Sequence, residues 1–180
     1  MNQILDARGL DETIDRMADL LVDLCPADVP WAIVGIRTRG VALAERLKTR
    51  LEKRVEPSIP LGWLDITLYR DDLHELDTYP IVRQTKLGFD VTDLCVILCD
   101  DVLFTGRTVR AALNALTDFG RPKYVKLAVL VDRGHRELPI QADVVGVTIH
   151  TEKNEIVDVQ MSETDAADGV VVRQQSPAKP

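Results

Sequence analysis

The sequence has few cysteines and no long hydrophobic run. Its three cysteines, Cys25, Cys95 and Cys99, form an odd set without the spacing of a disulfide scaffold or a metal site. No stretch approaches the roughly 18 apolar residues that a membrane-spanning helix needs, and the N-terminus lacks the apolar segment of a signal peptide. We therefore expect a cytoplasmic protein that does not enter a membrane, with Cys95 and Cys99 as small residues of its core.

The chain also lacks an excess of positive charge. It carries 22 lysines and arginines against 29 aspartates and glutamates, a net charge of −7, which argues against a generic nucleic-acid binder but allows a local basic face. Its 180 residues suit one domain with a sizeable core. No internal repeat or linker divides the chain, so we expect one domain over residues 1–175 and a frayed polar tail over residues 176–180.

One stretch in the middle of the chain carries most of the functional information. The apolar run Val96-Ile97-Leu98-Cys99 predicts a buried strand, and two carboxylates, Asp100 and Asp101, follow it. The turn Thr105-Gly106-Arg107-Thr108 comes next, and a helix is expected over residues 109–116. A strand, a loop and a helix in this order point backbone N–H groups at an anion, and the helix N-terminus adds partial positive charge. The turn can therefore wrap one phosphate group.

The two aspartates indicate which phosphate ligand the turn would hold. The earlier glycine and the lysine of a nucleotide-binding P-loop are absent, and carboxylates beside a phosphate cradle repel the phosphate unless they have another partner. A sugar diol is the natural partner, because its hydroxyls donate hydrogen bonds to Asp100 and Asp101, with Mg²⁺ nearby to balance the charge. The combination predicts a ribose 5-phosphate site. The alternative is an acidic strand end followed by an ordinary helix.

A second unit of the same kind lies earlier in the chain. Residues 31–36 predict a buried strand, Arg37-Thr38-Arg39-Gly40 a polar turn, and residues 41 to about 53 a helix. Parallel α/β sheets bind ligands outside the carboxyl ends of their strands, so both turns can face one pocket. The arginines and the backbone of the earlier turn suit a second anion.

The remaining pattern alternates helices and strands, as an α/β fold with a parallel sheet requires. Helical spacing of apolar residues predicts a scaffold helix over residues 11–25. Strands are expected over residues 64–68, 124–131, 143–149 and 155–161, the last as an edge strand or hood segment. About 20 residues between positions 71 and 90 have no periodicity, which is typical of a lid or a binding loop.

The stretch from Asp100 to Thr108 resembles the phosphoribosyl-pyrophosphate (PRPP) motif of the type I phosphoribosyltransferases. Three further blocks are similar to one family, the bifunctional pyrimidine-operon regulators and uracil phosphoribosyltransferases of the PyrR type. They are residues 34–40, 65–72 and 127–140, the last of which ends in Asp132-Arg133-Gly134-His135-Arg136-Glu137-Leu138-Pro139-Ile140. The resemblance covers nearly the whole chain. The last block is the most discriminating, because general phosphoribosyltransferases share only the PRPP loop.

This resemblance implies a type I phosphoribosyltransferase fold, in which helices flank a twisted parallel sheet and a small hood covers the base. It implies transfer of a phosphoribosyl group from PRPP to uracil, giving UMP and pyrophosphate, with Mg²⁺ as cofactor. It also implies a homo-oligomer, a dimer or larger, that binds the leader of pyrimidine-biosynthesis messenger RNA. Uridine nucleotides such as UMP or UTP would promote this binding and so attenuate transcription.

The resemblance assigns roles to residues of this chain. Asp100 and Asp101 would hold the ribose hydroxyls, near a Mg²⁺ ion held mainly through PRPP, and Arg70 would act from a loop that closes over the leaving group. The 5-phosphate would lie on Thr105, Gly106, Arg107 and Thr108, pyrophosphate on Arg37, Thr38, Arg39 and Gly40, and the base near Val131, Asp132 and Arg133. Further candidates to reach pyrophosphate are Tyr69, Arg83 and Lys86.

Some positions leave alternatives open. Phe104 stands where many purine-specific relatives have a carboxylate, so no general base is assigned. His135 could be catalytic, could support its turn or could belong to a subunit contact. Gln141 and the segment 147–151 replace basic residues of the resembling family, which would weaken RNA contacts. The alternative functions are a uracil salvage enzyme without RNA regulation and a purine phosphoribosyltransferase, and the block from Asp132 to Ile140 argues against the latter.

The basic residues of the helix expected after Gly40 allow two interpretations. They are interleaved with Glu45, Glu52 and Glu56, which favours a solvated face with ion pairs between helix neighbours. The other interpretation is an RNA-binding surface. The basic residues concerned are Arg46, Lys48, Arg50, Lys53 and Arg54.

Overall fold

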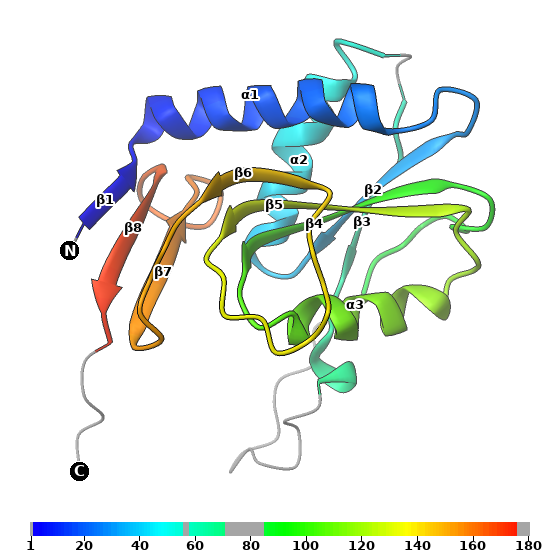
Figure 1. Ribbon diagram of the computed structural model, residues 1–180. Coiled ribbons are helices and arrows are strands. Elements are labelled where there is room, and N and C mark those ends of the chain that lie inside the picture. Colours follow the sequence, from blue (N-terminus) through cyan, green and yellow to red (C-terminus); the bar gives the residue numbers. More distant parts are fainter. Residues whose placement is uncertain (1, 56–57, 71–84, 176–180) are drawn as a thin grey trace.

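A five-stranded parallel sheet forms the centre of the computed structural model, which describes residues 2–55, 58–70 and 85–175 (Figure 1). The strand order is β3-β2-β4-β5-β6, and each pairing in this sheet is parallel. The chain passes from β2 to β3 on one side and returns to β4 on the other, so the strand order reverses between β2 and β4. The strands are β2 (Trp31–Ile36), β3 (Leu61–Leu64), β4 (Cys95–Leu103), β5 (Tyr124–Asp132) and β6 (Val144–Thr148).

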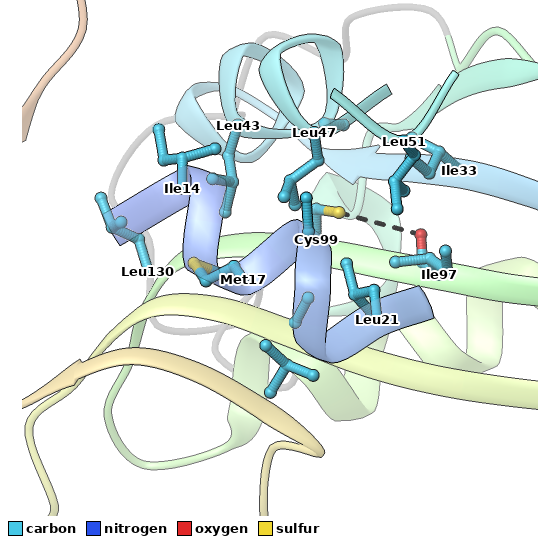
Figure 2. Packing of buried hydrophobic residues seen from close by; sticks show 14 of the residues in the cluster. Ile14, Met17, Leu21, Ile33, Leu43, Leu47, Leu51, Ile97, Cys99 and Leu130 are labelled. Atoms are coloured by element: carbon cyan, nitrogen blue, oxygen red, sulfur yellow. Dashed lines mark hydrogen bonds between the residues drawn. The ribbon is translucent and has the colours of Figure 1, made fainter. Parts of the chain in front are cut away.

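Helices cover both faces of this sheet. α1 (Ala7–Leu24) and α2 (Arg39–Leu51) lie on one face, and α3 (Arg107–Thr117) lies on the other (Figure 1). Side chains of β4 alternate between the faces, so Ile97 and Cys99 pack with α1 and α2, while Val96 and Leu98 pack with α3. Figure 2 shows the first cluster, to which the two helices contribute Ile14, Met17, Leu21, Leu43, Leu47 and Leu51. Because both faces are buried, the central strands are continuous apolar runs.

A second sheet, of three antiparallel strands, forms the hood that the resemblance implied. Its order is β1-β8-β7, and β7 contacts β4 of the main sheet. Its strands are β1 (Asn2–Leu5), β7 (Glu155–Gln160) and β8 (Gly169–Gln174). The segment expected as an edge strand or hood is β7, whereas β1 and β8 were not anticipated. The α/β fold with a parallel sheet, flanking helices and a hood is therefore confirmed.

The boundaries of the other elements lie within a few residues of the predicted ones. α1 begins before Asp11 because Asp6 caps it, with its carboxylate accepting a hydrogen bond from the Gly9 N–H at 2.7 Å. α2 begins at Arg39, inside the predicted turn. All three cysteines are buried and free. The tail over residues 176–180 lies outside the described residues. Within the described ranges, no helix is long and apolar enough to cross a membrane.

The strand predicted over residues 64–68 is wrong beyond Leu64. β3 ends at Leu64 because this residue pairs with Ile36, where its partner strand β2 also ends. The Asp65 carboxylate then accepts a hydrogen bond from the Thr67 N–H at 2.9 Å, and a single 3-10 turn follows over Thr67–Tyr69. The alternating residues therefore form a turn at the carboxyl edge of the sheet.

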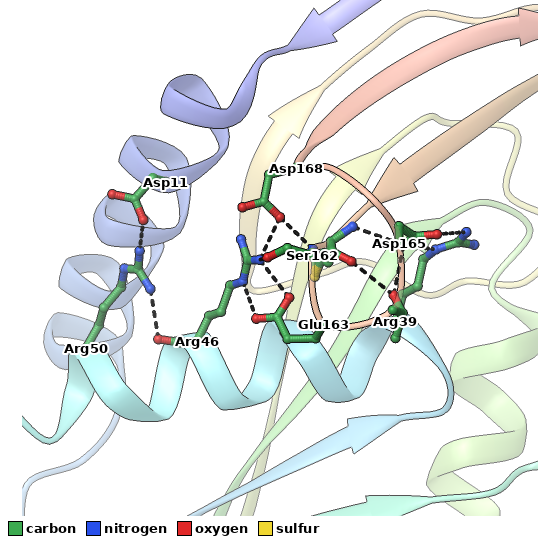
Figure 3. A network of polar contacts seen from close by, with 10 residues as sticks. Asp11, Arg39, Arg46, Arg50, Ser162, Glu163, Asp165 and Asp168 are labelled. Atoms are coloured by element: carbon green, nitrogen blue, oxygen red, sulfur yellow. Dashed lines mark hydrogen bonds and ion pairs between the residues drawn. The ribbon is translucent and has the colours of Figure 1, made fainter.

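The basic residues of α2, and Arg54 beyond its end, form ion pairs within the chain. The predicted pairing between helix neighbours is found for Lys48 and Glu52, whereas the arginines pair with other elements. The arginines pair with carboxylates of α1 and of the turn after β7, and some of these contacts are drawn in Figure 3. The pairs are Arg46 with Glu163 and Asp168, Arg50 with Asp11, Arg54 with Asp15 and Asp19, and Lys48 with Glu52. These positive charges are therefore largely compensated by the fold itself.

Candidate active site

A cavity of about 370 Å³ lies at the carboxyl ends of β2, β3 and β4. This is the position where the strand order reverses, and parallel sheets bind ligands at such positions. Its lining contains Arg37, Thr38, Asp65, Ile66, Thr67, Arg70, Asp100, Asp101, Val102 and Thr108. The cavity therefore brings together six residues that sequence analysis proposed for the site: Arg37, Thr38, Arg70, Asp100, Asp101 and Thr108.

The two aspartates at the end of β4 have different environments. Asp100 is only 5% exposed, and burial together with the neighbouring Asp101 raises the pKa of its carboxyl well above the usual range. Asp101 is half-buried and donates its backbone N–H to Asp100 Oδ1 at 3.0 Å. Because adjacent carboxylates repel each other, a cation or a pair of hydroxyl donors entering the cavity would stabilise both.

The predicted phosphate loop leads directly into α3 and is supported by the turn after β5. Gly106 has φ +92°, a conformation that favours glycine, and α3 begins at the next residue. The Thr105 carbonyl accepts hydrogen bonds from the N–H groups of Glu137 and Leu138 at 3.0 and 3.2 Å, and Arg107 pairs with Glu137 at 2.8 Å. Of the four loop residues, Thr108 lines the cavity. The others lie at the helix N-terminus, a geometry that suits a phosphate.

The turn between β2 and α2 packs directly on β4. A Cβ atom on Gly40 would lie 2.6 Å from the Cys99 carbonyl oxygen and 3.2 Å from the Asp100 Cα, so only glycine allows this approach. Arg37 and Thr38, which are joined by a cis peptide bond, are thereby held beside Asp100. The turn and the aspartates consequently face the same cavity.

Arg39 contacts the hood and is not among the residues that line the cavity (Figure 3). Its Nη2 lies 3.1 Å from Asp165 Oδ1 and 3.6 Å from Asp158 Oδ1. Asp165 also accepts hydrogen bonds from the Met161 N–H at 3.0 Å and the Thr164 hydroxyl at 2.8 Å. These donors, with Arg39 the most important, lower the pKa of Asp165 to about 2. Arg39 therefore links the start of α2 to the hood.

The three residues predicted near the base are the last two residues of β5, Val131 and Asp132, and the residue after it, Arg133, and none of them lines the cavity. Val131 is fully buried, and the Asp132 carboxylate accepts hydrogen bonds from the Gly134 N–H at 2.9 Å and from Arg136 at 2.5 Å. Arg133 is 6% exposed and donates to the carbonyls of Glu152 and Glu155 at 2.8 and 2.9 Å. The side chains of Asp132 and Arg133 are thus engaged within the protein.

Phe104 and His135 pack against each other next to this rim. The Arg133 guanidinium carbon lies 4.1 Å from the centre of the Phe104 ring, and the His135 ring meets Phe104 edge-on at 5.8 Å. His135 has φ 60°, and its Nε2 donates to the Thr151 carbonyl at 2.6 Å. These contacts favour the turn-supporting interpretation of His135 over the catalytic one.

Residues on either side of the predicted lid loop are anchored to the fold. Trp63 and Lys86 exchange backbone hydrogen bonds of 2.9 and 3.0 Å. The cationic groups of Lys86 and Arg37 lie 5.1 and 5.7 Å from the centre of the Trp63 ring. Arg110 donates to the Tyr69 carbonyl at 3.0 Å, and the Tyr69 hydroxyl bonds to Asp118. Arg83 and residues 71–84 as a whole lie outside the described residues.

The lining of the cavity also contains Asp65, Ile66 and Thr67, which were not predicted as site residues. They follow β3 directly, as the predicted turns follow β2 and β4. A correct boundary for β3 would have placed them at the same edge of the sheet. Because a strand was wrongly predicted over residues 64–68, these three residues were not recognised as a turn at the edge of the sheet.

Three carboxylate residues line the cavity, namely Asp65, Asp100 and Asp101. In the described part of the chain, no group of three or more His, Cys, Asp or Glu side chains is arranged to hold a metal ion. Mg²⁺ prefers six oxygen ligands in near-octahedral geometry. Asp100 and Asp101 therefore fit Mg²⁺ only together with oxygen ligands from a substrate or water.

Comparison with known proteins identifies similar sequences and a similar fold. Residues 1–164 match the phosphoribosyl transferase domain. The chain is 52% identical over 165 residues to the "Bifunctional protein PyrR" of Deinococcus radiodurans, covering 92% of this chain and 90% of the relative. It is 49% identical over 176 residues to the protein of the same name from Syntrophobacter fumaroxidans, covering 98% and 95%. A crystal structure of the hypoxanthine phosphoribosyltransferase of Trypanosoma cruzi superposes with a TM-score of 0.70 at 16% identity over 97% of both chains, which shows the fold alone.

Proposed function

The chain belongs to the phosphoribosyltransferase family and, within it, to the PyrR type, and from this we propose that it transfers a 5-phosphoribosyl group from PRPP to uracil, giving UMP and pyrophosphate. We also propose that it attenuates pyrimidine-biosynthesis genes by binding leader RNA in response to uridine nucleotides. One observation carries the enzymatic part. The cavity combines a carboxylate pair, the N-terminal turn of α3 and the turn that carries Arg37.

PRPP fits this arrangement group by group. The ribose hydroxyls would donate to Asp100 and Asp101, and the 5-phosphate would lie on residues 105–108 at the N-terminus of α3. Pyrophosphate would contact the side chains of Arg37 and Thr38 and the backbone of their turn. In the reaction, the bond from the ribose C1 carbon to the pyrophosphate oxygen breaks, a bond from C1 to the uracil N1 nitrogen forms, and the N1 proton leaves.

Electrostatics and orientation would supply most of the rate. The transition state is oxocarbenium-like, so catalysis requires that the leaving group's charge is stabilised and that the reactants are held in line. Arg37 and Arg70 line the cavity and are the side chains proposed to stabilise the pyrophosphate charge. Phe104 cannot abstract a proton, so we assign no general base.

Mg²⁺ is the proposed cofactor, and the chemistry of the carboxylate pair supports it. Asp100 is buried beside Asp101, an arrangement that a cation would stabilise. When bound with PRPP, Mg²⁺ neutralises part of the pyrophosphate charge. Asp100 and Asp101 are the residues of this chain that would lie near it.

We place uracil at the rim formed by Val131, Asp132 and Arg133, on the side of the hood. Because the polar side chains of Asp132 and Arg133 already have partners, backbone groups of this rim would recognise the base edges. Arg133 and Arg136 would keep that backbone in place, since Arg136 also donates to the Phe104 carbonyl at 2.9 Å.

The regulatory part of the proposal includes a homo-oligomer and an RNA partner. One observation favours the alternative of a salvage enzyme without RNA binding. Arg46 and Arg50 of α2, and Arg54 beyond its end, are paired with carboxylates of the same chain, so these arginines do not form a free basic surface. Phosphate contacts with RNA depend on accessible positive charge.

The enzymatic proposal is tested by measuring UMP formation from uracil and PRPP, with hypoxanthine and guanine as competing bases. We expect turnover of uracil alone, and no turnover by the double variant Asp100→Asn/Asp101→Asn. Turnover of a purine base would support the purine alternative instead. Near-normal activity of the double variant would overturn the assigned role of the aspartates.

The regulatory proposal is tested by titrating the protein into a pyrimidine-operon leader RNA, with and without UMP, at two salt concentrations. Binding that UMP strengthens and salt weakens is the expected result. Uracil transferase activity without RNA binding under either condition would identify a salvage enzyme.

A further inference from the structure

We propose that Arg39 is a positioning residue that holds the turn of residues 37–40 against the hood, through Asp165 and Asp158, and that it does not itself contact pyrophosphate. The inference rests on the proposed role of this turn in binding pyrophosphate. It adds that the hood contributes indirectly to binding of the leaving group, because its carboxylates hold the turn in place.

The placement of Arg39 separates it from its neighbours in the turn. Thr38 and Arg37 line the cavity, whereas Arg39 begins α2 and its guanidinium lies between two hood carboxylates. Its Nη2 and Nε lie 3.1 and 3.4 Å from the two carboxylate oxygens of Asp165. A guanidinium that meets a carboxylate through two nitrogens has a fixed orientation as well as a favourable charge interaction.

The hood presents these carboxylates in fixed positions. Asp165 is held by the Met161 N–H and the Thr164 hydroxyl, and its own N–H donates to the Met161 carbonyl at 2.7 Å. Asp158 lies on β7, where it also approaches Arg173 at 3.9 Å. Because both carboxylates have partners of their own in the hood, they form an anchor for Arg39 and hence for the backbone that follows Thr38.

A second arginine of α2 provides an internal comparison. Arg46 lies seven residues after Arg39, on the same side of the helix, and pairs with Glu163 and Asp168 at 2.6 and 2.7 Å (Figure 3). It therefore fastens the same hood turn to the middle of α2. Arg39 fastens it to the end of α2 that carries the cavity residues. Loss of either ion pair should weaken the attachment of the hood to α2. Only loss of the Arg39 pair should also change the position of the turn of residues 37–40.

The two possible roles of Arg39 predict different effects of the Asp165→Asn substitution on pyrophosphate binding. If Arg39 were a pyrophosphate ligand, Asp165 would compete with the ligand, and Asp165→Asn would leave pyrophosphate binding unchanged or strengthen it. If Arg39 is a positioning residue, Asp165→Asn and Arg39→Gln remove the same anchor. Both would then weaken binding, and their effects would not add.

The experiment measures the dissociation constant of pyrophosphate, and kcat and KM for PRPP, in the full-length protein. We expect Arg39→Gln and Asp165→Asn each to raise the pyrophosphate Kd and the PRPP KM by about 10-fold, with a smaller effect on kcat. The double variant should resemble the more affected single variant. Arg39→Lys should recover part of the affinity, because its charge can still pair with Asp165.

Arg46→Gln and Asp168→Asn are the matched controls. They should lower the Tm but leave the Kd and KM within about twofold of the wild type. Equal losses of affinity in the control variants would overturn the proposal, as would unchanged or tighter pyrophosphate binding by Asp165→Asn. A wild-type chain that binds neither PRPP nor pyrophosphate would instead refute the proposed function. If Arg39→Gln fails to fold, the Asp165→Asn and Arg39→Lys variants still test the proposal.

Discussion

Replacing Gly40 with alanine tests the close packing of the cationic turn on β4. The new Cβ would lie 2.6 Å from the Cys99 carbonyl oxygen and 3.2 Å from the Asp100 Cα. Both are backbone atoms of the central strand, so they cannot rotate away as a side chain would. An ordinary contact requires about 3.5 Å, and the turn must therefore move from β4 by roughly 0.5–1 Å.

This displacement should affect both stability and binding. Overpacking of this kind costs about 1–3 kcal/mol, while the higher helix propensity of alanine offsets at most about 1 kcal/mol. A net loss of this size lowers the Tm of a domain of this length by several degrees. Because a misplacement of about 1 Å can reduce catalysis about 100-fold, we expect kcat/KM for PRPP to fall by about 30–100-fold.

The assay compares the Tm and PRPP kinetics of Gly40→Ala with those of Glu45→Ala. Glu45 is an exposed residue of the same helix and does not line the cavity, so this control should behave as the wild type. If Gly40→Ala loses stability but keeps normal kinetics, the position of the turn does not control PRPP binding. If it keeps both, the close approach of the turn to β4 is itself incorrect.

Three further changes have defined outcomes. Asp100→Asn removes a buried carboxylate that lies beside the carboxylate of Asp101, so the Tm in metal-free buffer should rise while turnover is lost. A lower Tm would contradict this account. The Trp63 ring lies near Arg37, so in a Trp31→Phe background its fluorescence should change when pyrophosphate is added, and a Trp63→Phe chain should give no such signal. Because the folded-state pKa of Asp165 is lowered to about 2, its stabilisation is complete above its unfolded value of about 3.9 and is lost as the pH falls through about 2. The Tm difference between the wild type and Asp165→Asn should therefore be constant between about pH 5 and 8, decrease below about pH 4 and vanish only below about pH 2. A difference that varies across the neutral range would argue against this pair.

The two turns of the site were predictable because each part is continuous in sequence. In both cases a buried strand, a polar turn and the start of a helix follow one another, as in residues 96–108 and 31–40. The buried strands can be predicted from their apolar composition alone, since both faces of the sheet are covered by helices. Their common edge then follows from the parallel arrangement, which places Thr38 and Asp100 at one cavity.

The partners of Arg39 and Arg133 were not predictable, because distant segments supply them. Asp165 lies 126 residues from Arg39, and nothing in the turn distinguishes an arginine that meets a hood from one that meets an anion. The acceptors of Arg133 include backbone carbonyls, which every residue type possesses. The short strand β1 likewise depends on its pairing with β8, which lies far from it in the sequence and pairs with β7 on its other side.

The pairing of β1 with β8 has a consequence for the synthesis of the protein. β1 leaves the ribosome early, but its partner residues 170–172 emerge only after the whole parallel sheet has been made. Asp158 and Asp165, which anchor the cationic turn, belong to the same late segment. A nascent chain can therefore assemble its sheet and its aspartate pair while translation continues, yet the anchor proposed for the cationic turn is complete only when β8 has been added.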